Sequence, residues 1–97
     1  MKAVTPELTV VTETVRCWLV ERSYDDKGMV DLVYATPDGE RRYHRQLAAD
    51  RLARASVTAA RDVDADQLVP VDDPGTRQRY ATEVDRVASR HDPDDEM

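Results

Sequence analysis

Two turn signals lie about one strand length apart in the first half of the chain, and they constrain the fold more than any other feature. One is Asp-Asp-Lys-Gly at 25–28, and the other contains Pro-Asp-Gly at 37–39. Proline presets φ at the first central position of a turn, and glycine adopts the left-handed conformation that many hairpins need. The sequence therefore predicts a meander of three antiparallel strands, the first beginning at residue 15 and the others covering 29–36 and 41–47.

Alternation within these segments predicts which side chains share a face. In the second strand the apolar side chains Val30, Leu32 and Tyr34 point to one face, and Asp31 starts the alternate set. The first strand alternates in the same way but is apolar on both faces near Trp18. A strand with two apolar faces is favoured at a central position in the sheet.

The clearest helical signal lies near the end of the chain. Asp73 is a good N-cap, and Pro74 fits the first helical position. An apolar stripe follows at i, i+4, i+7 and i+8, formed by Tyr80, Val84, Val87 and Ala88. This pattern predicts a helix that packs one face against the sheet.

Weaker helical signals precede it. Residues 47–55 are rich in helix formers, and a shorter turn starts at Asp64, where Gln67 completes a pattern that resembles a capping box. Residues 68–71 are expected to be an extended connector. The predicted fold class is α+β: a three-stranded antiparallel meander, with a fourth strand as the alternative, packed by the C-terminal helix and one or two shorter helices.

Length limits the chain to one domain. With 97 residues it holds a single core, predicted over 14–91. Residues 1–13 are expected to be a flexible arm or an extra strand, and residues 92–97 an acidic disordered tail. No apolar run approaches the roughly 20 residues that cross a bilayer, and no secretory signal pattern is found. We therefore expect a cytoplasmic protein with no membrane contact.

The charged residues are of unusual types. Acidic residues outnumber basic ones by 20 to 14, giving a net charge of -6. Twelve of the basic residues are arginine, and 14 of the acidic ones are aspartate. Short carboxylates hold water and cations, and concentrated salt screens their mutual repulsion. The composition predicts a salt-adapted, halophilic protein that binds salt cations diffusely; the alternative is an ordinary acidic protein from a GC-rich genome.

The sequence offers no recognisable catalytic or metal-binding pattern. Cys17 is the only cysteine and lies inside an apolar strand, where cysteine is usually a buried hydrophobe. The two histidines, His44 and His91, lie in no motif. A pair formed by Cys17 and His44 would supply only two of the four ligands of a structural zinc site. We therefore expect no catalytic residues, no metal, no cofactor and no enzyme activity.

Two surfaces remain as candidates for binding. The leading hypothesis is a non-enzymatic interaction module that uses the sheet face or edge around Trp18 and Tyr24 to bind a protein partner or a second copy. The second hypothesis is a nucleic-acid-binding accessory protein that uses Arg41, Arg42, Tyr43 and Arg45, with an aromatic side chain from a neighbouring strand. The alternative for this cluster is that Tyr43 packs in the core while the arginines pair across the sheet with acids such as Glu21, Asp31 and Glu40.

Four segments resemble a family of small, uncharacterised haloarchaeal proteins of unknown function. They are CWLVERSY at 17–24, LVYATPDGER at 32–41, VDDP at 71–74 and RHDPDDE at 90–96. The second of these is the most specific. The resemblance implies a single domain and a salt-loving source, and it implies no activity, cofactor or site residue.

Overall fold

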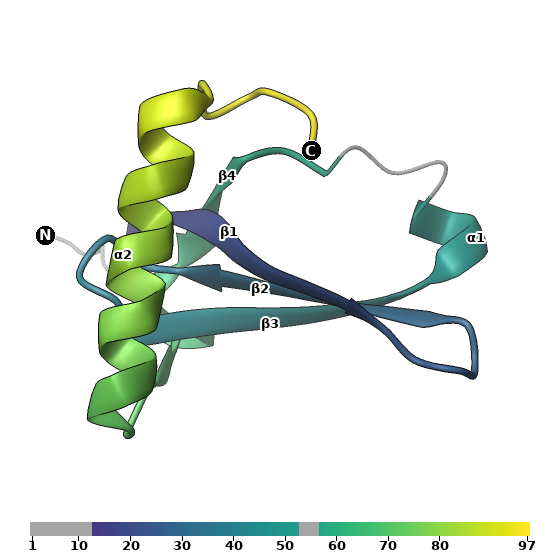
Figure 1. Ribbon diagram of the computed structural model, residues 1–97, viewed down its shortest axis with the longest axis horizontal. Helices are drawn as coiled ribbons and strands as arrows, with labels where there is room; N and C mark the ends of the chain where they lie inside the picture. Colours follow the sequence, from purple (N-terminus) through teal and green to yellow (C-terminus); the bar gives the residue numbers. More distant parts are fainter. Residues whose placement is uncertain (1–12, 53–56) are drawn as a thin grey trace, which may run out of the picture.

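The computed structural model describes residues 13–52 and 57–97. They form a five-stranded antiparallel sheet in the order β4-β1-β2-β3-β5, with a long helix, α2, lying across one face (Figure 1). The elements are β1 (Thr14–Tyr24), β2 (Met29–Ala35), β3 (Arg41–Ala48), α1 (Ala49–Leu52), β4 (Ala60–Asp64), the 3-10 helix η1 (Ala65–Gln67), β5 (Val69–Pro70) and α2 (Pro74–Arg90). The fold class is α+β, as predicted, but the sheet has two more strands than the predicted meander.

The predicted meander is confirmed. β2 pairs with β1 on one side and with β3 on the other, through turns that end in Gly28 and Gly39. Both glycines have positive φ, at 84° and 74°. The turn signals therefore identified both hairpins because each needs a residue in the left-handed region.

Two further strands extend the sheet: β4 lies in a segment for which the sequence predicts no strand, and β5 lies in the predicted connector. Residues 60–64 form β4 beside β1, and the connector contributes β5, which pairs with Arg41 and Arg42. The helix predicted over 47–55 begins after β3 and is helical over Ala49–Leu52, and residues 53–55 lie outside the described part. The short turn predicted from Asp64 is present as η1, but the capping box is wrong, because the Asp64 side chain makes no cap hydrogen bond. The candidate fourth strand in 1–13 also lies almost wholly outside the described residues.

A β-bulge interrupts β1. Leu19 pairs with Tyr34, but the next paired residue, Glu21, lies opposite Val33, so Val20 is the extra residue. One inserted residue exchanges the two faces for the rest of the strand. Odd-numbered residues before the bulge therefore share a face with even-numbered residues after it.

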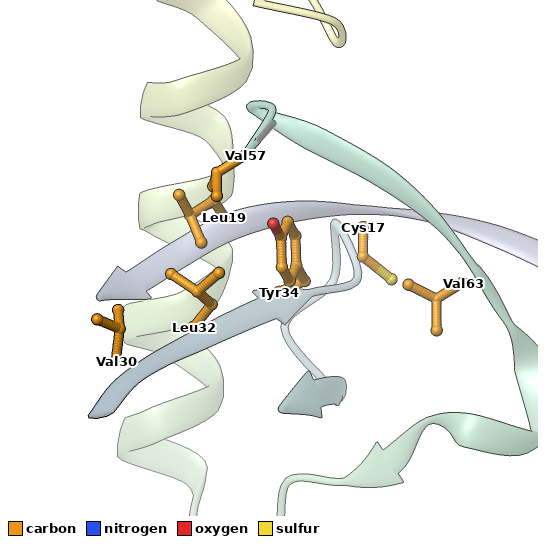
Figure 2. Close-up of a cluster of buried hydrophobic side chains, with 7 residues drawn as sticks. All are labelled: Cys17, Leu19, Val30, Leu32, Tyr34, Val57 and Val63. Atoms are coloured by element: carbon orange, nitrogen blue, oxygen red, sulfur yellow. The ribbon is translucent and has the colours of Figure 1, made fainter. Parts of the chain in front are cut away.

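Each face of the sheet carries a buried cluster of side chains. The face opposite α2 carries a core cluster that includes the most deeply buried large side chains, among them Tyr34, Leu32 and Val30. Figure 2 shows this cluster, in which the Cys17 thiol points toward Val63 of β4. The other face packs against α2 through a smaller cluster of Val33, Ala35, Val71, Tyr80 and Val84. The predicted alternation in β2 is therefore confirmed, and each of its faces is buried.

α2 begins and packs as the sequence predicts. The Asp73 side chain accepts a hydrogen bond from the Thr76 amide at 2.8 Å, and Pro74 is the first helical residue. Tyr80, Val84 and Val87 of the predicted apolar stripe are buried, whereas Ala88 is exposed. No helix in the two described ranges is long and apolar enough to cross a membrane.

The segment 92–97 differs from the expected disordered tail. It lies alongside residues 57–60, and the Met97 amide donates to the Val57 carbonyl at 2.8 Å. The amide of Ala60 donates to the Pro93 carbonyl at 2.9 Å, and Thr58 forms an antiparallel bridge with Glu96. Residues 92–97 therefore pair with residues 57–60, the segment that leads into β4.

Candidate functional site

The outer edge of β3 is open for most of its length. β5 pairs only with Arg41 and Arg42, at one end of the strand. From Tyr43 to Ala48, β3 pairs with β2 alone, and no other described strand lies on its outer side. In Figure 1, β3 runs below β2 near α2 and extends to the right beyond the helix. The open stretch has the length of an ordinary strand.

The backbone groups on this edge alternate in direction. The carbonyl of Arg41 accepts from the Thr36 amide of the neighbouring hairpin strand at 3.0 Å, so Arg41 directs its hydrogen bonds toward β2. Alternate residues of an antiparallel strand bond to opposite sides. His44 and Gln46 therefore direct their N–H and C=O groups outward, and these groups bond to no described residue.

β3 carries three arginines: Arg45 lies on the open stretch, and Arg41 and Arg42 lie on the end that pairs with β5. Arg41, Arg42 and Arg45 have no carboxylate within ion-pair distance among the residues that the structure describes. His44 contacts the Asp31 carboxylate at 2.9 Å. The predicted pairing of these arginines with acids across the sheet is therefore absent from the described residues, and Arg45 is the arginine that the open stretch carries.

The acids that were expected to pair with the arginines bind other groups. Asp31 accepts hydrogen bonds from His44 and Gln46, the latter at 3.1 Å. Glu21 accepts from the Tyr80 hydroxyl at 3.3 Å and lies 3.9 Å from the Arg79 guanidinium. These acids are therefore engaged with β3 polar groups and with α2.

Tyr43 is a packing residue on the face opposite α2. Its ring centroid lies 6.3 Å from that of Tyr34, and the Arg61 guanidinium lies 5.5 Å from it. Trp18 packs against the other face of the sheet, beside α2. The structure therefore does not bring Tyr43 and Trp18 onto one aromatic surface, and the core-packing alternative for Tyr43 matches the observed contacts.

The two aromatic residues of the other candidate surface also separate. The bulge at Val20 places Trp18 on the α2 face and Tyr24 on the opposite face, where Tyr24 pairs with Val30. Tyr24 is 63 % exposed, with the Arg22 guanidinium 6.0 Å from its ring. Trp18 and Tyr24 therefore belong to different surfaces.

The surroundings of Cys17 do not activate its thiol. The side chain is fully buried, and burial raises the pKa of its thiol to about 11, with the charge of Arg41 opposing this shift. A thiol with this pKa is almost entirely protonated near neutral pH, whereas a nucleophile or metal ligand needs the thiolate. His44 lies on the opposite face of the sheet from Cys17, and the described residues contain no group of three or more potential metal ligands.

Sequence reasoning found the arginines of the edge but missed its key backbone groups. His44 and Gln46 matter here because β3 is next to last in the sheet and β5 covers only its first two residues. No residue pattern within 41–48 signals that strand order. Arg61 was missed for the same reason, since it reaches Tyr43 from β4, which the sequence did not predict.

Similarity to known proteins gives a family and no function. No curated protein and no solved structure shows significant similarity to this chain. A family model described as a family of unknown function (DUF7967) matches residues 11–97, which include every described element of the fold. The chain therefore belongs to the family of unknown function DUF7967.

Proposed function

We propose that this protein is an interaction module that binds an extended, acidic segment of a partner protein along the open edge of β3. The observation that carries the proposal is the outward direction of the N–H and C=O groups of His44 and Gln46, which bond to no described residue. Such an edge accepts an added strand, because main-chain hydrogen bonds supply affinity with little dependence on sequence.

The charges on this edge support an acidic partner. Arg45 lies on the open stretch and projects to the face opposite α2, so an added strand meets its guanidinium there, whereas Arg42 projects to the other face and already pairs with Val69 of β5. Cross-strand pairs of opposite charge stabilise a sheet, whereas like charges directly opposite one another destabilise it. An extended segment with aspartate or glutamate opposite Arg45 therefore fits this edge.

A second copy of this chain fits the edge less well. The symmetric antiparallel register that uses both His44 and Gln46 places Arg45 opposite the Arg45 of the other copy. Two arginines in that position repel each other. We therefore favour a different protein over a homodimer at this edge.

The test is a selection of displayed random peptides against the whole protein. We expect the selected peptides to be acidic and rich in strand-forming residues. Gln46→Pro removes an outward N–H while leaving the ladder to β2 intact, so it should abolish binding. Gln46→Ala is the matched control, because it removes the same side chain and keeps the N–H.

Charge reversal gives a second measure that leaves the backbone unchanged. Arg45→Glu should weaken the acidic peptides, and Arg90→Glu on α2 should not. Peptide binding that survives Gln46→Pro would contradict the proposal. If the protein instead retains RNA or DNA, and loses it on charge reversal, the nucleic-acid hypothesis based on Arg41, Arg42, Tyr43 and Arg45 replaces it.

We propose that the chain catalyses no reaction. We also propose that it works in a salt-rich cytoplasm. The high-pKa Cys17 thiol and the scattered histidines support a binding role rather than catalysis. The excess of aspartate and arginine over glutamate and lysine supports adaptation to salt. In such salt, main-chain hydrogen bonds keep their strength while exposed charge pairs are screened, so the open backbone is the main source of affinity.

A further inference from the structure

A groove runs between α2 and the β1 residue Trp18. It has a volume of about 550 Å³, and its walls include Pro37 from the β2–β3 turn and Ala81 and Ala88 from α2. Trp18 is partly exposed here, and Val84 forms the buried part of the helix surface. The groove therefore combines one large aromatic side chain with small apolar side chains, and Gln78 and Thr82 add two neutral polar groups to its walls.

The only charged side chain in the lining of this groove is a carboxylate. Its lining contains no lysine, arginine or histidine, and its one ionisable side chain is Asp85. Asp85 is exposed and has no hydrogen bond or ion pair with any residue that the structure describes. The neighbouring arginine on α2, Arg86, is held by Glu83 at 2.6 Å. The Asp85 carboxylate is therefore available to a cation that enters the groove.

We propose that this groove binds a quaternary ammonium group, with Trp18 as the cation–π partner and Asp85 as the counter-charge. Tryptophan gives the strongest cation–π interaction of the aromatic side chains. A methylated ammonium ion also presents apolar methyl groups, which pack against Pro37 and Ala81 on leaving water. A primary ammonium is more strongly hydrated and gains less from such walls.

The test uses Trp18 as its own probe. Trp18 is the only tryptophan in the chain, so tryptophan-selective fluorescence reports on the groove alone. The probes are choline, its neutral isostere 3,3-dimethylbutan-1-ol, guanidinium and ammonium, all titrated at constant ionic strength. We expect a saturable change with choline and at least about threefold weaker binding of the neutral isostere. Equal binding of the neutral isostere, or tighter binding of guanidinium, would overturn the proposal.

Two substitutions distinguish a direct role of the Asp85 carboxylate in choline binding from the effect of the protein's net charge. Asp85→Asn should weaken choline binding by about threefold or more. Asp66→Asn, an exposed carboxylate on η1 outside this groove, should leave it unchanged. Both sites are exposed, so both variants should fold, which circular dichroism checks. Equal affinities of the two variants for choline would show that Asp85 takes no part and would contradict the proposal.

The two sources of a quaternary ammonium group can be compared in the same assay. Tighter binding of free choline supports a small-molecule ligand, and tighter binding of a peptide with trimethyl-lysine supports a modified protein chain. Both outcomes support the site and identify its source, whereas saturation by neither refutes it. The groove lining includes no residue of β3, so Gln46→Pro should leave choline binding unchanged.

Discussion

The two hairpins of the meander share their local chemistry and differ in their surroundings. In the β1–β2 turn the Asp25 carboxylate accepts from the Lys27 and Met29 amides at 2.9 Å, and Gly28 has positive φ. In the β2–β3 turn the Asp38 carboxylate accepts from the Glu40 amide, also at 2.9 Å, and the glycine again has positive φ. The first turn projects away from α2, whereas the second lies against it (Figure 1).

The difference is clearest at the two glycines. A Cβ added to Gly28 meets no atom within 4 Å, so only its backbone conformation restricts the residue. A Cβ added to Gly39 would overlap the Arg77 carbonyl and lie 2.9 Å from the Ala81 amide nitrogen. The second turn therefore acts as a docking point for α2, while the first is a free loop. A turn motif thus indicates a hairpin but does not reveal what packs against it.

The largest effect is expected for Gly39→Ala. The substitution combines an unfavourable left-handed conformation with overlap against helix backbone, which has little freedom to move. We expect a loss of about 3 kcal/mol or more in the free energy of unfolding, measured by urea denaturation. The loss should be accompanied by faster amide exchange in α2, because the helix separates from the turn.

Gly28→Ala is the matched variant and should have a smaller effect. Only the left-handed conformation opposes it, at about 1 kcal/mol. Denaturation of both variants under the same conditions gives the comparison directly, and amide exchange in α2 should remain that of the parent protein. Equal losses for the two variants would show that α2 does not pack on the second turn in solution.

The features predicted from sequence are those that depend on near neighbours. Each turn needs a left-handed glycine within a few residues, and α2 needs an N-cap and a repeating apolar stripe. These requirements are visible in the order of the residues. The same reasoning identified the arginines of the β3 edge, because their alternation within the strand fixes their faces.

The features missed from sequence depend on partners far along the chain. β4 has only Ala60 and Val63 as buried residues, and it is a strand because β1 pairs with it, not because of its own propensity. The bulge at Val20 depends on register with β2, and it separates Trp18 from Tyr24. The open edge of β3 follows from where the two-residue β5 ends. Strand order and register therefore decided which candidate residues share a surface.

The smallest expected effect concerns the pH dependence contributed by the second turn. The Thr36 hydroxyl donates to the Asp38 carboxylate at 2.6 Å, and with the Glu40 amide it lowers the pKa of Asp38 below its ordinary value of 3.8. The stability that the ionised Asp38 contributes is therefore fully present above the unfolded-state pKa, and it is lost as the pH falls through the lower folded-state pKa.

Asp38→Asn keeps a hydrogen-bond acceptor but removes this charge, so its destabilisation should be largest near neutral pH and should shrink below about pH 4. Urea denaturation across that range measures the difference from the parent protein, and Asp26→Asn in the first turn controls for the same change in net charge. A difference for Asp38→Asn that stays constant down to the acid limit would mean that the Thr36 hydroxyl does not favour the ionised carboxylate. Thr36 is 2 % exposed, and its hydroxyl also accepts a hydrogen bond from the Arg41 amide at 3.2 Å. Such a result would therefore mean that the hydrogen bond to the Asp38 carboxylate adds little stability, while the bond from Arg41 remains. The stability of the β2–β3 hairpin would then come from its backbone hydrogen bonds and from the packing of Gly39 against α2, which the Gly39→Ala variant tests.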